Sequence, residues 1–222
     1  MSNIDISPIY LSIKLAIMTT IILLIISLPI AWWLSKTKKK NIKSTIEAII
    51  TLPLVLPPTI LGFYILLLLN NNSIIGKTWF CITGTNIAFS FTGLIIGSCI
   101  YSLPFAIQPI QIAFEKIGKR PIKQATLLKA SKIDIFLNII IPLSKKGIIT
   151  SCILTFAHTL GEFGIILMIG GNIPEKTKVI SIAIYEAVEE LNYILAHKLS
   201  IIMLCISSII LIILYIANSN KK

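Results

Sequence analysis

The side chains with the clearest chemical potential are a glutamate and a histidine in one apolar segment. Glu162 is the only carboxylate within residues 147–170, and His158 lies four residues earlier, one helical turn away on the same face. Because an ionisable group inside a membrane is costly, we expect Glu162 to face protein or water and to have a partner. The two side chains form either a structural pair that fixes helix packing or part of the lining of a translocation path.

Enzymatic, metal and cofactor chemistry find no support in the sequence. The four cysteines have neither paired metal spacing nor a disulfide framework, which is typical of small buried hydrophobic side chains. Two histidines and one carboxylate inside an apolar run supply no haem pair and no acid–base dyad, as a membrane redox subunit or intramembrane enzyme would need. The chain has no GxxxxGKS or GxxxxGKT phosphate loop, so we expect no ATP hydrolysis by the chain itself. No catalytic residue, metal or cofactor is therefore expected.

The elements that must position Glu162 and His158 are membrane helices. The 222 residues are 55% hydrophobic and only 13% charged, and the mean hydropathy is +0.91. A helix needs about 20 apolar residues to cross a hydrocarbon core of about 30 Å. The apolar runs are continuous rather than alternating, which favours helices over a barrel. We therefore predict an all-α integral membrane protein, one domain over residues 1–222, with five spans at about 10–34, 47–69, 87–107, 147–170 and 198–217.

The basic residues are distributed unevenly between the segments that join these spans. Most of them lie in residues 36–43, in residues 108–146 and at Lys221 and Lys222. The positive-inside rule places these segments in the cytoplasm, the N-terminus outside and the C-terminus inside. The net charge of +11 is then a topology signal. A single arginine and no interleaving of basic with aromatic residues argue against nucleic-acid binding.

The second apolar run is interrupted by prolines. Pro53, Pro57 and Pro58 each remove a backbone donor and bend a helix, and Thr59 follows directly. Such a break is tolerated at membrane depth where the freed carbonyl groups face protein or a wet cavity. The run is therefore either a packing kink or a helix that lines a path.

Residues 115–146 form the longest polar interval of the chain and carry eight basic residues against two acidic ones. Pro121 suits an early helical position, and the apolar pattern of residues 122–132 predicts a short amphipathic helix. A second helix is predicted for residues 133–141, and Pro142 ends or kinks it. The interval is either a solvated loop that sets topology or a helical knob offered to a cytoplasmic partner.

The knob resembles the coupling segment of binding-protein-dependent ABC importer permeases. The family's Glu-Ala-Ala, Gly and Ile-x-Leu-Pro correspond to 123–125, Lys129 and 139–143, with lysine at both the Glu and the Gly position. Residues 52–64 resemble molybdate permeases in particular, and residues 156–164 resemble a stretch that molybdate and sulfate permeases share. The resemblance implies contact with an ATPase through Lys123, Gln124, Ala125, Leu128, Lys129, Ala130, Ser131 and Pro142. It implies a path or structural role for Pro57, Pro58, Thr59, His158 and Glu162.

The resemblance also implies a bacterial inner-membrane importer with a type I ABC permease fold. Such permeases work by alternating access as homodimers in the lipid bilayer, with two cytoplasmic ATPases and an outer oxyanion-binding protein. Molybdate, or tungstate, is the implied substrate, and sulfate or another oxyanion is the alternative. A non-transporting scaffold is a further alternative, because Lys123 and Lys129 depart from the coupling motif. Glu186, Glu189 and Glu190 form either a solvated face or a contact for the binding protein.

Overall fold

The computed structural model describes residues 5–219, and all regular elements within this range are helices. Lys221 and Lys222, which the sequence places in the cytoplasm, lie outside the described residues. The long and medium helices are α1 (Ser7–Lys36), α2 (Lys40–Val55), α3 (Pro58–Leu69), α4 (Ile74–Thr83), α5 (Phe91–Ile117), α9 (Lys145–Leu160), α11 (Ile180–Glu189) and α12 (Tyr193–Ser219). The short elements are α6 (Arg120–Leu127), α7 (Lys132–Ile135), the π-helix η1 (Phe136–Ile140), α8 (Ile141–Leu143) and α10 (Gly164–Gly170).

The predicted all-helical membrane fold is confirmed. Three helices are long and apolar enough to cross a bilayer, namely α1, α5 and the Tyr193–Ile213 part of α12. Two bent pairs bring the number of crossings to as many as five in the described chain. One is α2 with α3, bent by 107°, and the other is Lys132–Leu143 with α9, bent by 70°. The runs predicted as single spans at 47–69 and 147–170 each contain a helix break.

The helices α1, α5 and α9 pack against one another and form the central body. Polar residues of α1 such as Ser12, Thr19 and Ser27 are buried in this body, so one face of an almost uniformly apolar helix is fixed against protein. The outer face of α12 is mostly exposed, as expected for a helix that faces lipid. Because one face of each long helix is buried, the positions of the helix ends and of the breaks are fixed. The polar residues considered below lie at these ends and breaks.

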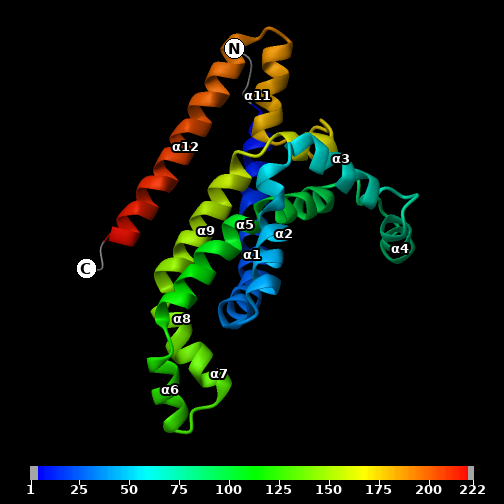
Figure 1. The fold of residues 1–222 in the computed structure, drawn as a ribbon. Coiled ribbons are helices and arrows are strands. Elements are labelled where there is room, and N and C mark those ends of the chain that lie inside the picture. Colours follow the sequence, from blue (N-terminus) through cyan, green and yellow to red (C-terminus); the bar gives the residue numbers. More distant parts are fainter. Residues whose placement is uncertain (1–4, 220–222) are drawn as a thin grey trace.

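Two hydrophobic clusters stabilise the two ends of the body. The α3–α10 cluster joins α1, α3, α5 and α10, with Leu94, Ile165 and Ile169 fully buried in it. The α6–η1 cluster joins α1, α2, α5 and the knob, and Ile110, Ile135 and Ile140 are among its buried members. In Figure 1 the α6–α7 knob and α11 lie at opposite ends of the molecule, while α4 projects to one side.

Candidate functional site

The first break in a span lies at Pro57 and Pro58. Helix α2 ends at Val55, where the Leu56 N–H donates to the Leu52 carbonyl, and α3 starts at Pro58. Because neither proline has an N–H, the carbonyl groups of Pro53 and Leu54 cannot receive the usual helical hydrogen bond. Thr59, in the first turn of α3, is exposed. The break therefore presents backbone carbonyls and a hydroxyl group at the point where the chain turns by 107°.

The second break separates α9 from α10 and contains Glu162. Helix α9 ends at Leu160, with the N–H of Gly161 bonded to carbonyls of the last turn, and α10 begins at Gly164. The sequence predicted a span at about 147–170, and within this range residues 161–163 leave the helix.

The two breaks lie against each other. A Cβ atom added to Gly164 would come within 3.0 Å of the Pro58 Cβ atom, so the first residue of α10 touches the first residue of α3. Only glycine permits this approach without movement of the proline ring. Behind this contact, α3 and α10 remain packed through Ile65, Ile165 and Ile169 of the α3–α10 cluster. Two chain breaks that are about 100 residues apart in the sequence thus form one structural unit.

Glu162 is anchored by two serines. Its side chain is only 5% exposed, and its Oε2 atom accepts a hydrogen bond of 2.7 Å from the Ser98 hydroxyl of α5. Its backbone carbonyl accepts a 2.6 Å bond from the Ser181 hydroxyl of α11. The Oε1 atom has no hydrogen-bond partner among the described residues. Glu162 therefore connects the break to α5 and α11.

His158 has partners of its own on α5. Its Nδ1 atom lies 2.9 Å from the Ser102 hydroxyl, which is also 3.0 Å from the Thr159 hydroxyl. The rings of Tyr101 and Phe105 lie beside the imidazole, at centroid distances of 4.8 and 4.1 Å. No hydrogen bond or ion pair in the described chain joins His158 to Glu162. The one-turn pairing expected from sequence is absent because the helix ends between the two residues.

The knob begins with α6, and its first helix is shorter than predicted. Pro121 occupies the first turn, as expected, but α6 ends at Leu127 rather than near residue 132. The Lys129 N–H donates to the Thr126 carbonyl and the Ala130 N–H donates to the Ala125 carbonyl. This pair of bonds is the Schellman arrangement, which requires a left-handed residue. Lys129 supplies it with φ of 58°, a conformation that glycine adopts without strain.

The second half of the knob is defined by Ser131 and Pro142. Ser131 starts α7 with a capping box, in which its hydroxyl and the Asp134 carboxylate each accept a backbone N–H of the other residue. The following residues 136–140 form a π-helix, and the Ile141 N–H donates to the Phe136 carbonyl. Pro142 has no N–H to donate to the carbonyl four residues earlier. The π-helix just before it changes the hydrogen-bond spacing at the point where that bond is missing. The predicted break at Pro142 is thus the junction of η1, α8 and α9.

The knob presents both exposed and buried residues from the predicted set. Lys123, Gln124, Lys129, Ser131 and Pro142 are exposed, and Ala130 is partly buried. Leu127 and Leu128 are each 83% exposed, and Ile133 is 70% exposed. Ala125, expected to be a docking anchor, is only 7% exposed and belongs to the α6–η1 cluster. The most exposed large apolar side chains of the knob therefore lie at the α6–α7 turn.

A polar network between α2 and α5 was not predicted from the sequence. Gln111 donates to Glu47 at 2.6 Å and to Glu115 at 2.9 Å, and the Lys43 ammonium group lies 2.8 Å from the same Glu115 oxygen. Closer to the break at Pro57 and Pro58, Gln108 donates to the Thr51 hydroxyl at 3.1 Å. The spacing of four residues between Lys43 and Glu47 and between Gln111 and Glu115 was the available signal.

A second polar group lies beside α11, at the end of the molecule opposite the knob. Lys178 forms an ion pair with Glu186, whose second oxygen accepts a 2.7 Å bond from Asn172. The bond from Lys178 and the bond from Asn172 hold the pKa of Glu186 below its usual value. Tyr185 donates to Glu189 at 2.5 Å. Two of the three predicted acidic residues are thus engaged within the chain.

The all-helical body has broken spans and a projecting helical knob, and the comparisons with known proteins identify the class as a transport permease. A family model described as "Binding-protein-dependent transport system inner membrane component" matches residues 12–220. The chain belongs to this family of multi-pass inner-membrane transport subunits. It is 47% identical over its whole length, and over 97% of the relative, to the "Molybdenum transport system permease protein ModB" of Azotobacter vinelandii.

Other relatives and solved structures show how far the likeness extends. The ModB of Escherichia coli K12 is 30% identical over 81% of this chain and 78% of its own length. A "Probable sulfate transport system permease protein cysT" of Helicosporidium is 31% identical over 94% of this chain and 77% of its own. The fold matches a bacterial alginate ABC transporter with a TM-score of 0.78 at 15% identity, covering 100% of this chain and 81% of that one. It matches the MetNI methionine ABC transporter at 0.72 and 15%, covering 97% and 94%.

Proposed function

We propose that the chain is the permease subunit of an ATP-driven importer that moves molybdate, or the chemically similar tungstate, across the bacterial inner membrane. The observation that carries this proposal is the full-length likeness to a molybdenum permease at 47% identity. The sulfate relative at 31% makes sulfate the alternative substrate. Both anions are tetrahedral dianions, so charge and geometry do not separate the two candidate substrates.

The proposed assembly is a homodimer with two cytoplasmic ATPase subunits and an outer oxyanion-binding protein. The chain supplies no catalytic residue, and ATP hydrolysis belongs to the ATPase. The knob lies in the cytoplasm and α11 lies outside, in keeping with the lysine distribution and with the positions of these elements at opposite ends (Figure 1). The same proposed orientation puts the N-terminus outside and the C-terminus inside, and we propose that the permease is a single domain.

The α6–α7 turn is the proposed contact with the ATPase. Leu127, Leu128 and Ile133 are exposed apolar side chains surrounded by the lysines of the knob. A helix that docks in a groove places a few apolar anchors in the groove and leaves charges at the rim. Lys123 and Lys129 suit such a rim, where charges mainly tune the encounter. Their difference from the family motif is then compatible with docking.

The knob is connected to the two breaks through packed residues of α2 and α5. Ile135 and Ile140 of the knob are buried in the α6–η1 cluster together with α1, α2 and α5 residues. Because a packed cluster transmits displacement rather than absorbing it, closure of the ATPases would tilt α5 and α2. Helix α2 leads to the Pro57–Pro58 break, and α5 leads to Ser98 beside Glu162. The two breaks in contact are therefore the hinge of the proposed alternating access.

The proposed function is tested by uptake into proteoliposomes that contain the chain, its ATPase and its binding protein. ATP-dependent entry of radioactive molybdate is expected, with tungstate as a strong competitor and sulfate as a weak one. Stronger competition by sulfate than by tungstate would assign the chain to sulfate instead. Absence of ATP-dependent uptake of all three anions would refute the importer proposal and favour the scaffold.

Docking is tested by co-purification with the ATPase. Leu128→Asp is expected to release the ATPase, because it places a charge where an apolar anchor enters a groove. Ile74→Asp, an equally exposed apolar position on α4, is the matched control and should retain the ATPase. Ala125→Asp is expected to destabilise the knob itself, since Ala125 is buried. Full retention of the ATPase by the double variant Leu127→Asp, Leu128→Asp would contradict docking at this turn.

Orientation is tested by labelling single cysteines from either side in a variant without native cysteines. Position 129 is expected to react with an impermeant thiol reagent only after the membrane is opened. Position 176, near α11, is expected to react from outside. Labelling of position 129 in intact cells would contradict the proposed topology.

A further inference from the structure

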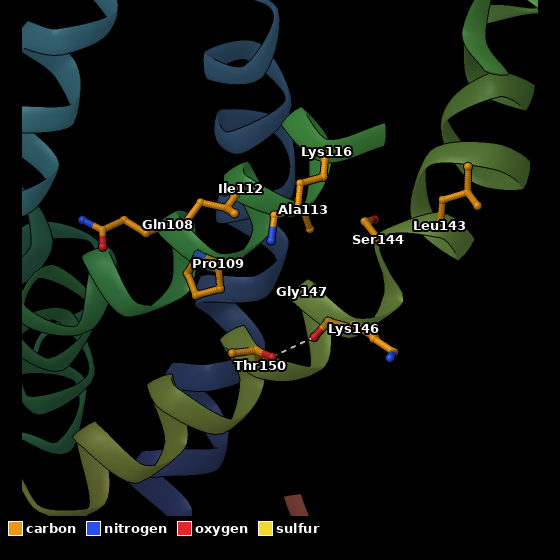
Figure 2. Close-up of a pocket in the computed structure, with 10 residues that line it drawn as sticks. All are labelled: Gln108, Pro109, Ile112, Ala113, Lys116, Leu143, Ser144, Lys146, Gly147 and Thr150. Atoms are coloured by element: carbon orange, nitrogen blue, oxygen red, sulfur yellow. Dashed lines mark hydrogen bonds between the residues drawn. The ribbon is translucent and has the colours of Figure 1, made fainter. Parts of the chain in front are cut away.

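The knob joins the body at a bend beside an open cavity. Residues Lys132–Leu143 and helix α9 meet at 70°, and Ser144 lies between them. The cavity has a volume of about 700 Å³. Figure 2 shows Leu143 and Ser144 on one side of it and Ile112 and Lys116 of α5 on the other. Leu143 is 59% exposed, so the cavity leaves room for the angle of the knob to change.

Just beyond the bend, the first turn of α9 rests closely on α5. A Cβ atom at Gly147 would lie 2.3 Å from the Ala113 Cβ atom and 2.8 Å from the Pro109 carbonyl oxygen. Glycine is therefore required for this approach. One turn further along α9, the Ser151 hydroxyl donates to the Ala106 carbonyl at 2.7 Å. Because α9 is held on α5 from its first turn, the bend is the nearest point at which the knob can turn.

On the other side of α5, aromatic rings from three segments meet. The ring centroid of Phe136 in η1 lies 5.6 Å from that of Trp32 in α1 and 6.2 Å from that of Phe114 in α5. The Trp32 and Phe114 rings are 5.6 Å apart, edge to face, an arrangement that aromatic pairs prefer. Phe114 is two residues from both Ile112 and Lys116, so it points about 160° away from these cavity residues. The three rings form the ring triangle.

The π-helix turns this part of the knob towards the body. Ile135 and Ile140 are both buried, although residues five apart in an α-helix point about 140° away from each other. The hydrogen bond from the Ile141 N–H to the Phe136 carbonyl spans five residues and widens the turn between them. Both isoleucines can therefore face the same cluster. Phe136 begins this turn and is the only aromatic residue within 115–146, so the knob contributes one ring to the ring triangle.

We propose that Phe136 is a positioning residue that transmits turning of the knob to α1 and α5. The inference rests on the proposed function, in which the ATPases move the knob. When the knob turns at the bend, the cavity accepts the moving segment and the Phe136 ring presses on Trp32 and Phe114. These two rings belong to different long helices, so α1 and α5 are displaced together. Aliphatic burial is not directional, so a leucine at position 136 keeps an apolar contact but loses the oriented one.

The role of Phe136 is tested by the ratio of ATP hydrolysed to molybdate imported, in proteoliposomes that contain the chain, its ATPase and its binding protein. Phe136→Leu is expected to raise this ratio about fivefold or more, the size of a typical coupling between sites. Phe136→Tyr keeps the ring and should show the ratio of the parent. Leu28→Ala removes packing from a non-aromatic member of the same cluster on α1. It is the matched control for lost packing and should also keep the parent ratio.

A parent-like ratio in Phe136→Leu overturns the inference, and so does an equal rise in Leu28→Ala, because lost packing would then suffice. If Phe136→Leu does not assemble with the ATPase, Trp32→Leu removes the same contact from α1. It should raise the ratio while Trp32→Phe does not, and a parent-like ratio in Trp32→Leu overturns the inference. Failure of both leucine variants to assemble assigns the ring triangle to folding and also overturns it. Each of these results leaves ATP-dependent uptake by the parent intact, whereas no uptake by the parent refutes the proposed function itself.

Discussion

Replacing Lys129 with glycine is the most direct test of the local structure of the knob. Lys129 has a left-handed backbone, with φ of 58°, and its N–H and the next one close the end of α6. A residue with a Cβ atom costs roughly 1–2 kcal/mol in this conformation. Its side chain is exposed, so its removal deletes no buried contact.

The expected gain is smaller than the full strain. Glycine increases the entropy of the unfolded chain, which destabilises the folded state by about 0.4–1 kcal/mol. The difference leaves a net stabilisation of about 1 kcal/mol. Such a change corresponds to about a fivefold decrease in the equilibrium constant for local opening of α6. Lys123→Gly is the matched control, because Lys123 lies inside the same helix and there glycine destabilises by about 1 kcal/mol.

Hydrogen exchange measured by mass spectrometry on a peptide covering 120–131, in nanodiscs, reports this opening directly. Lys129→Gly should slow exchange about fivefold, and Lys123→Gly should accelerate it by a similar factor. If both variants accelerate exchange, Lys129 is not strained and the left-handed end of α6 is wrong. If both leave exchange unchanged, α6 does not open locally and the energetic argument fails.

Two further predictions concern the break and the outer end. Glu162→Ala should lower the thermal unfolding midpoint in detergent by several degrees, because loss of the Ser98 partner costs about 1–3 kcal/mol. Glu162→Gln should lower the unfolding midpoint less than Glu162→Ala does. His158→Ala should also lower the midpoint less than Glu162→Ala, since Ser102 keeps its contact with Thr159. A larger loss for His158→Ala would contradict these assignments. Near α11, the lowered pKa of Glu186 stabilises the fold above the unfolded-state pKa, and this contribution disappears as the pH falls through the folded-state pKa. Exchange protection of α11 should therefore decrease in acid, and Glu186→Gln should remove that dependence; an unchanged acid response in this variant would refute it.

The membrane class and the approximate positions of the helices could be predicted because they depend on long runs of one composition. About 20 apolar residues identify a span whatever its neighbours are. Pro57, Pro58 and Pro142 likewise mark breaks, because a missing N–H has the same consequence in any helix. The position of α6, with Pro121 in its first turn, followed from the same local rules.

The partners of the polar side chains could not be predicted in the same way. Helical spacing placed His158 beside Glu162, but Gly161 ends the helix between them and each side chain turns to a different serine of α5. The burial of Ala125 depends on tertiary packing in the α6–η1 cluster, and its place in the apolar pattern of α6 did not reveal which side faced the body. Sequence periodicity identifies an apolar face and leaves open what covers it.

The contact between the two breaks gives the coupling argument its physical basis. A kink in one helix alone could be a packing adjustment. Here Gly164 at the start of α10 touches Pro58 at the start of α3, and Glu162 connects the same break to α5 and α11. Displacement of α3 at Pro58 is therefore expected to displace α10 as well. Because Ile135 and Ile140 of the knob share a hydrophobic cluster with residues of α2 and α5, we expect a displacement at the proposed ATPase contact to reach both breaks.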